Sequence, residues 1–253
     1  MKRILAGNWK MNLGVAEART LFAAVAEGAR RHESVSFLVF PPATALHALA
    51  GVRRADDPRL GAQNCHPEPK GAFTGEIAAE QAKDAGAEYL LVGHSERRRL
   101  FCESDALVRQ KLQAAWRAGL TPVLCVGETL AERERRETRD ILGRQIRRAL
   151  EGASPRAPLL VAYEPVWAIG TGVVASIEEV AEAHGWVEEE IAAAGRRGHS
   201  ETPVLYGGSV DPKNSVALAR IEAVGGFLVG GASLKEESFL AIAGALDAQR
   251  TPH

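Results

Sequence analysis

Leu159-Leu160-Val161-Ala162-Tyr163-Glu164 is an apolar run that ends on a carboxylate. The run shows no alternation of apolar and polar residues, which a strand with one face in water would have. It is typical of a strand that is buried on both faces, as in a parallel sheet covered by helices. Residues 159–164 therefore indicate an α/β protein with a carboxylate at the end of a buried strand.

Similar apolar runs recur along the whole chain, and segments of helical period separate them. The runs are residues 4–6, 35–40, 60–62, 89–92, 122–126, 159–163, 204–206 and 227–229. The helical segments lie near residues 17–31, 105–118, 131–150, 177–194 and 236–248. A repeated strand–helix order predicts a parallel sheet with right-handed crossovers.

The length of the chain fits a closed barrel. A (β/α)8 barrel takes roughly 250 residues, and this chain has 253. We therefore predict an α/β fold of the TIM-barrel type, with a closed parallel eight-stranded sheet and one catalytic domain over residues 1–253. A doubly wound open sheet is the main alternative, because a strand count does not show closure.

Composition and charge exclude several classes of partner. The chain is 46% hydrophobic and 25% charged, and its formal net charge of -1 gives no reason to expect a nucleic-acid or membrane-surface partner. We expect no signal peptide, because Gly7-Asn8-Trp9-Lys10 ends the first apolar run early, and no run is long enough to span a bilayer. Cys65, Cys102 and Cys125 form no CxxC pair, so a reducing cytoplasm is the expected compartment.

Polar and glycine residues follow the predicted strands at the points where they end. In a parallel barrel all strand C-termini share one rim, so we expect these residues to meet there in one site. They are Asn8 and Lys10 after the first run, His94 and Glu96 after the fourth, Glu164 after the sixth, Ser209 after the seventh, and Gly230-Gly231 after the eighth.

Six motifs closely resemble the triosephosphate isomerase family, in the family's order and spacing. They are GNWKMN at 7–12, GHSERR at 93–98, CVGE at 125–128, AYEPVWAIGTG at 162–172, YGGSV at 206–210 and LVGGAS at 228–233. The resemblance covers essentially the whole chain. It implies cofactor-free interconversion of dihydroxyacetone phosphate and D-glyceraldehyde 3-phosphate through an enediol(ate), a step of glycolysis and gluconeogenesis.

The resemblance makes Glu164 the base that removes a proton from the carbon beside a carbonyl. A carboxylate needs a dry pocket to act as a base. Ile169 and Leu228 would close over Glu164 and exclude water, and Cys125 is expected nearby. Outside the eleven-residue motif at 162–172, a lone glutamate would be read as an ordinary surface residue.

His94 precedes Ser95-Glu96-Arg97, where a short helix could begin. A helix N-terminus disfavours the imidazolium ion, and a neutral ring N–H can polarise a substrate carbonyl, as in the family. His94-Ser95-Glu96 also fits the H-x-E half of a zinc deaminase signature, but the required P-C-x-x-C is absent. We therefore predict no metal.

Charge and glycine at the strand ends suit a phosphorylated triose. Lys10 is a point charge for a phosphoryl group and an enediolate, Asn8 can donate to the same region, and Glu96 would pair with Lys10. Glycine lets backbone N–H groups approach an anion closely. By resemblance the phosphate set is Gly170, Ser209, Gly230 and Gly231.

A lid is expected from Pro165 to about Ala175. In the family the closed lid is held by residues that match Tyr206 and Ser209, and Trp167 moves with it. Gly170-Thr171-Gly172-Val173-Val174-Ala175 fits the dinucleotide pattern G-x-G-x-x-A. We reject that reading because the pattern should follow its strand directly, and residues 164–169 intervene.

A long loop after the third strand carries Thr74-Gly75-Glu76, which resembles the family's dimer loop, and Gln63-Asn64 fits the same interface. A long loop in a compact domain usually has a function. We expect a homodimer, with a tetramer as an alternative.

The chain departs from the family pattern at several positions. Glu188 and Gly226 stand where the family usually has an Arg–Asp ion pair, and since both charges are absent we expect local repacking with activity kept. Cys102 replaces a usual glycine and could be an oxidation-prone surface thiol. Arg135-Arg136-Glu137 replaces a stretch that usually contains glycine.

Two other functions remain open from the sequence. A different phosphate-binding barrel enzyme, such as an indole- or ribulose-type isomerase, would share Gly230-Gly231 but not Asn8, Lys10, His94 and Glu164. A non-catalytic scaffold on the same fold is the other, because a fold alone does not establish catalysis.

Overall fold

The computed structural model of the chain describes residues 2–169, 173–196 and 201–248. Within them, eight parallel strands form a closed barrel in sequence order, and β8 pairs back to β1. The predicted closed barrel is therefore confirmed, and the open doubly wound sheet is excluded. The strands are β1 (Arg3–Asn8), β2 (Val35–Phe40), β3 (Arg59–Ala62), β4 (Tyr89–Val92), β5 (Thr121–Val126), β6 (Leu160–Tyr163), β7 (Val204–Tyr206) and β8 (Gly226–Val229).

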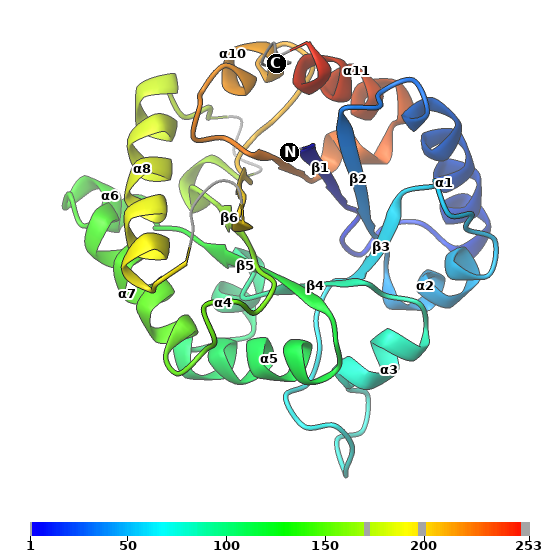
Figure 1. The fold of residues 1–253 in the computed structure, drawn as a ribbon, viewed down its shortest axis with the longest axis horizontal. Coiled ribbons are helices and arrows are strands. Elements are labelled where there is room, and N and C mark those ends of the chain that lie inside the picture. The colour runs from blue at the N-terminus through cyan, green and yellow to red at the C-terminus, as the bar shows by residue number, and fades with distance from the viewer. Residues whose placement is uncertain (1, 170–172, 197–200, 249–253) are drawn as a thin grey trace.

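Helices surround the barrel as an outer ring (Figure 1). The long ones are those predicted from the 3.6-residue period, and short helices were missed because they offer too few residues to show a period. The helices are α1 (Val15–Ala29), α2 (Ala43–Ala50), α3 (Ala79–Asp84), α4 (Ser95–Leu100), α5 (Asp105–Arg117), α6 (Leu130–Glu134), α7 (Thr138–Leu150), α8 (Ile177–Ala193), α10 (Ser215–Ala219) and α11 (Glu236–Asp247), with 3-10 turns η1 (Val166–Ala168) and η2 (Gly231–Leu234). In the described residues, no helix combines the length and the apolar character that crossing a membrane requires.

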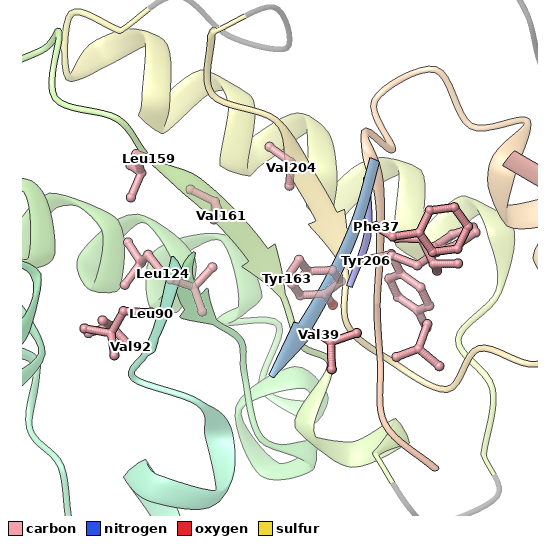
Figure 2. Close-up of a cluster of buried hydrophobic side chains, with 14 of the residues drawn as sticks. Phe37, Val39, Leu90, Val92, Leu124, Leu159, Val161, Tyr163, Val204 and Tyr206 are labelled. Atoms are coloured by element: carbon pink, nitrogen blue, oxygen red, sulfur yellow. The ribbon is translucent and has the colours of Figure 1, made fainter. Parts of the chain in front are cut away.

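Two buried clusters explain why the strand runs do not alternate. Side chains such as Leu38, Val123 and Leu205 fill the barrel interior. Their neighbours along the same strands pack outward against the helices, among them Val39, Leu124 and Val204 (Figure 2). Because the strands are buried on both faces in this way, most of their positions are apolar. The rigid barrel that results fixes the positions of the strand ends.

The single helix predicted over 131–150 is wrong, because the structure has two helices there. Thr129 begins α6 with a capping box to Glu132, and α6 ends at Glu134. Arg136 then has a φ of 60°, a left-handed conformation that an α-helix does not continue. α7 starts two residues later at Thr138.

Both predicted replacements of glycine fall on left-handed backbone. Cys102 has a φ of 53° and Arg136 a φ of 60°. A side chain in this region costs about 1 kcal/mol relative to glycine. The two departures from the family pattern therefore keep the backbone shape that a glycine would have, at a cost in stability. The Cys102 residue is exposed, as expected.

The backbone at Gly226 leaves no room for a side chain. Gly226 has a φ of 153°, and a Cβ there would lie 1.9 Å from the carbonyl oxygen of Ile4. A side chain at 226 would thus force β8 away from β1. Gly225 is the less crowded neighbour, because its Cβ would find no atom closer than 3.1 Å. β8 itself is not displaced, since Gly226 keeps its register with Ile4 and with Leu205.

Candidate active site

A cavity of about 340 Å³ opens at the C-terminal ends of the strands. It brings together residues from distant parts of the chain, most of which the sequence had singled out. Its lining consists of Asn8, Lys10, His94, Glu164, Ile169, Gly207, Gly208, Ser209, Val210, Asp211, Leu228, Gly230, Gly231 and Ala232.

Glu164 follows β6 directly and is held at both carboxylate oxygens. It is 2% exposed. Its Oε2 accepts a hydrogen bond of 2.8 Å from the backbone N–H of Ser95, and its Oε1 lies 3.1 Å from Nε2 of His94. Leu228 and Ile169 line the cavity beside it. The carboxylate is therefore dry, oriented and turned toward the histidine.

His94 is the N-cap of α4, and its hydrogen bonds fix the ring tautomer. The backbone N–H of Glu96 donates to Nδ1 over 3.2 Å. An accepting Nδ1 carries no proton, so the neutral ring has its proton on Nε2. A Glu96 carboxylate oxygen also lies 3.6 Å from Nδ1, but the 3.2 Å bond is the shorter and needs the Nδ1 lone pair. Nε2–H consequently faces Glu164 and the cavity.

Lys10 reaches the cavity from a strained position just past β1. Its φ is 51°. The backbone N–H of Lys10 donates to Oδ1 of Asn8 over 3.0 Å, and the side-chain amide of Gln63 donates to the carbonyl of Lys10 over 2.8 Å. The ammonium group lies 2.6 Å from a carboxylate oxygen of Glu96. These bonds hold the left-handed backbone that directs the ammonium group to the cavity.

Next to Lys10, the cavity is lined by backbone with little side chain. A Cβ on Gly231 would meet no atom within 4 Å, and one on Gly230 would lie 3.5 Å from Cε of Lys10. Ser209 lies beside them after β7, where its carbonyl accepts a 2.9 Å bond from the amide of Asn214. Open backbone next to an ammonium group is an arrangement that suits an anion.

Two further glycines fit around the base and a buried tyrosine. A Cβ on Gly207 would lie 2.9 Å from Cγ of Glu164, and one on Gly208 would lie 2.2 Å from the hydroxyl of Tyr206. That hydroxyl is buried and has no hydrogen-bond partner among the described residues. Burial also raises the pKa of Tyr206. A buried hydroxyl of this kind usually has a hydrogen-bond partner.

Glu128 accepts hydrogen bonds from Tyr163 at the end of β6 and from Trp167 in the segment that follows it. It is fully buried and accepts a 2.8 Å bond from the indole N–H of Trp167 and a 3.2 Å bond from the hydroxyl of Tyr163. The guanidinium of Arg133 stacks over the Trp167 ring at 4.7 Å. Trp167 is thus fixed to the end of β5.

Burial raises the pKa of the Glu128 carboxyl above its ordinary value, although the Trp167 bond and the Arg133 charge oppose the shift. Between the ordinary pKa of 4.5 and the raised one, the folded state binds more protons than the unfolded state, so stability falls as pH rises. Glu128→Gln removes this titration. We expect the variant's melting temperature, relative to the parent, to be higher at about pH 7.5 than at about pH 4.5. Thermal melts followed by circular dichroism would check this, and equal differences at both pH values would contradict it.

Three groups of predicted residues remain: Cys125, the dimer-loop residues 74–76, and Gly170. Cys125 is fully buried, and its pKa is raised well above the ordinary value by burial and by the nearby Glu164 charge. Thr74, Gly75 and Glu76 are exposed in the loop between β3 and α3, away from this chain's own cavity. Gly170 lies outside the described residues.

The comparisons with known proteins agree with this geometry. A family model for triosephosphate isomerase matches residues 3–246. The chain belongs to the triosephosphate isomerase family. The family predicted from the sequence motifs is therefore confirmed.

Relatives within the triosephosphate isomerase family match almost end to end. The triosephosphate isomerase of Bradyrhizobium diazoefficiens is 47% identical over 244 residues, which are 96% of this chain and 97% of that protein. The one from Aquifex aeolicus is 42% identical over 243 residues, 96% of this chain and 98% of that protein. The crystal structure of triosephosphate isomerase from Bartonella henselae matches with a TM-score of 0.88 and 41% identity, covering 97% of this chain and 99% of that one.

Sequence reasoning missed several residues that shape this triosephosphate isomerase site. The side-chain amide of Gln63 also donates within the chain, to the carbonyls of Lys10 and Phe40, a role that the sequence did not indicate. Glu128 has a place only in the motif at 125–128, and no motif contains Gln145. A single glutamine in a loop or helix carries no periodic signal, so only the fold reveals such partners. No group of three or more potential metal ligands occurs among the described residues.

Proposed function

We propose that Glu164 is the base of a triose phosphate isomerisation carried out in the 340 Å³ cavity. As a triosephosphate isomerase, the chain interconverts dihydroxyacetone phosphate and D-glyceraldehyde 3-phosphate. The observation that carries the assignment is the pairing of a buried carboxylate with the Nε2–H of His94 at 3.1 Å. No other functional class that we considered uses a dry base and a neutral imidazole beside an anion cradle.

The proton moves between two adjacent carbons of the substrate. Glu164 removes it from the carbon beside the carbonyl, and His94 donates a hydrogen bond from Nε2 to the oxygen that gains charge. The substrate must lie between these two groups, so their 3.1 Å contact has to open on binding. The proton of the adjacent hydroxyl group passes to the former carbonyl oxygen, and the protonated Glu164 returns its proton to the former carbonyl carbon. The two transfers together exchange aldehyde for ketone without net gain or loss of a proton.

Lys10 and the glycine side of the cavity hold the charged end of the substrate. The Lys10 ammonium stabilises both the phosphate and the enediolate, and Asn8 supports the same region. The backbone at Ser209, Gly230 and Gly231 leaves room for phosphate oxygens to approach N–H groups. Gly170 would add a donor from the lid. Glu96 keeps Lys10 in place through the 2.6 Å ion pair.

We further propose that the segment from Pro165 to about Ala175 closes over the substrate. The indole N–H of Trp167 donates to Glu128 in this structure, and the buried hydroxyl of Tyr206 has no hydrogen-bond partner among the described residues. Closure would give that hydroxyl an acceptor and bring Ile169 over Glu164. Excluding water in this way protects a reactive enediolate from side reactions.

A coupled assay with D-glyceraldehyde 3-phosphate tests the function directly. Formation of dihydroxyacetone phosphate without added metal or organic cofactor would support it, and silence with phosphate still bound would favour a non-catalytic scaffold. The Glu164 variant treated in the Discussion then tests the base. Nothing in the site favours the indole- or ribulose-type alternative.

We propose that the chain works as a homodimer through Thr74, Gly75 and Glu76. The loop between β3 and α3 projects from the barrel (Figure 1), and it is flanked by exposed apolar residues such as Phe73 and Ile77. Thr74→Arg would place a bulky charge at the loop tip. We expect light scattering to give twice 27.1 kDa for the parent and 27.1 kDa for the variant. A parent of 27.1 kDa would contradict a dimer, and four times that mass would indicate a tetramer.

Residues 1–253 are proposed to act as one catalytic domain in the cytoplasm. The strands and helices that hold the proposed site run from β1 to α11 around one barrel. Cys65, Cys102 and Cys125 are all free, which suits a reducing compartment.

A further inference from the structure

Gln145 on α7 bonds to both backbone groups of one residue at the end of β5. Its Oε1 accepts a 2.9 Å hydrogen bond from the N–H of Gly127, and its Nε2 donates a 3.0 Å bond to the carbonyl of Gly127. The glutamine is 5% exposed. A buried amide that uses both ends on a single backbone residue fixes the position and orientation of that residue.

Gly127 in turn packs directly on the backbone of Glu164. A Cβ on Gly127 would lie 1.8 Å from the Glu164 carbonyl oxygen. On either side of Gly127, backbone bonds join the two segments: Glu164 N–H donates to Val126 over 2.7 Å, and Val166 N–H donates to Glu128 over 3.1 Å. The segment that ends β5 therefore continues the pairing with β6 past the barrel rim, where Glu164 stands.

Gln145 thus supplies the hydrogen bonds that Gly127 does not make to the neighbouring strand. Val126 and Glu128 use their carbonyls on the Glu164 segment, whereas the N–H and carbonyl of Gly127 bond to a side chain on a surrounding helix. Without that amide, Gly127 would have to find other partners, and the backbone under Glu164 would lose its support. We propose that Gln145 is a positioning residue for the catalytic base, acting through Gly127. This inference rests on the proposed role of Glu164.

Gln145→Met keeps the length of the side chain and removes both hydrogen bonds. Because a misplacement of about 1 Å can cost on the order of 100-fold in rate, we expect kcat to fall by roughly 10- to 100-fold. Competitive inhibition by inorganic phosphate should remain nearly unchanged, because the groups that meet the phosphate follow β1, β7 and β8, whereas Gln145 contacts the end of β5. A cavity of about 490 Å³ beside Gln145 lets water reach the freed groups, so the variant is expected to fold.

Arg196→Met is the matched control. The Arg196 side chain is also 5% exposed, and it also donates two bonds to backbone carbonyls, those of Ala157 and Ser154. These lie before β6, at the opposite end of the strand from Glu164. A similar loss of melting temperature with nearly normal kcat is expected. Should Gln145→Met fail to fold, Gln145→Glu keeps the acceptor for the Gly127 N–H and replaces the donor with an oxygen that repels the Gly127 carbonyl, and its kcat is expected to fall with phosphate inhibition unchanged.

Glu164→Gln in the same assay separates this inference from the proposed function. If Glu164→Gln is inactive and the Gln145 variants keep normal kcat, the positioning role is wrong and the base assignment stands. The inference is overturned if the Gln145 variants lower both kcat and the affinity for inorganic phosphate. It is also overturned if Arg196→Met lowers kcat as much as Gln145→Met does, because the effect is then a general loss of structure. If Glu164→Gln retains activity, both assignments fail.

Discussion

Glu164→Gln is expected to lower kcat by on the order of 1,000-fold or more, because it removes the general base from the reaction. The change keeps the size of the side chain. The amide oxygen can still accept the 2.8 Å bond from the Ser95 N–H, so the local structure should persist. Phosphate inhibition should stay close to that of the parent, since Lys10 and the glycine backbone that meet the anion are unchanged. The coupled assay measures the first quantity, and inhibition by inorganic phosphate measures the second.

Glu88→Gln provides the matched control for that substitution. Glu88 lies just before β4, at the end of the barrel away from the cavity, where it pairs with Arg53 at 3.0 Å. The same chemical change there should leave kcat nearly unaltered. If Glu164→Gln kept nearly normal turnover, another group would have to be the base, and the proposed mechanism would be wrong.

The strands and the main site residues could be predicted because buried parallel strands leave a clear pattern. Glu164, His94 and Lys10 each follow an apolar run, and closure of the barrel puts all the strand ends on one rim. Local backbone conformation was harder to predict from the sequence. The break between α6 and α7 depends on the left-handed Arg136, and an arginine does not by itself indicate that conformation. The only signal was the resemblance, in which this stretch usually contains glycine.

The roles of neighbouring glycines and of single polar residues are also hard to predict from the sequence. Gly225 and Gly226 cannot be told apart by residue type, whereas the φ of Gly226 and its contact with Ile4 distinguish them at once. Gln145 lies among residues of helical period, and its partner, Gly127, is on a strand end that only folding brings near. The residues that position the site are thus the ones that the sequence does not reveal, because they act through contacts between different helices and strands.

Lys10→Met is the second variant with a large expected effect. Lys10 is the only lysine or arginine among the described residues that line the cavity, and the chain as a whole has a net charge of -1. A phosphate monoester carries about -1.5 to -2 charges near neutral pH, so one local cation has a large share in binding it. The same ammonium group stabilises the enediolate. We expect kcat/KM to fall by at least on the order of 1,000-fold.

The two variants should differ in what they do to phosphate binding. Lys10→Met should weaken inhibition by inorganic phosphate strongly, whereas Glu164→Gln should not, because only the first removes the charge that meets the anion. Stability should change little, since the Lys10–Glu96 pair is partly exposed and such pairs contribute about 0–1 kcal/mol. Lys83→Met on α3, which removes an exposed lysine that donates a 3.3 Å bond to the Gly119 carbonyl, is the control and should leave kcat/KM and phosphate inhibition nearly unchanged. Unchanged phosphate inhibition in Lys10→Met would mean that the glycine backbone alone binds the anion, and the role given to Lys10 would have to be withdrawn.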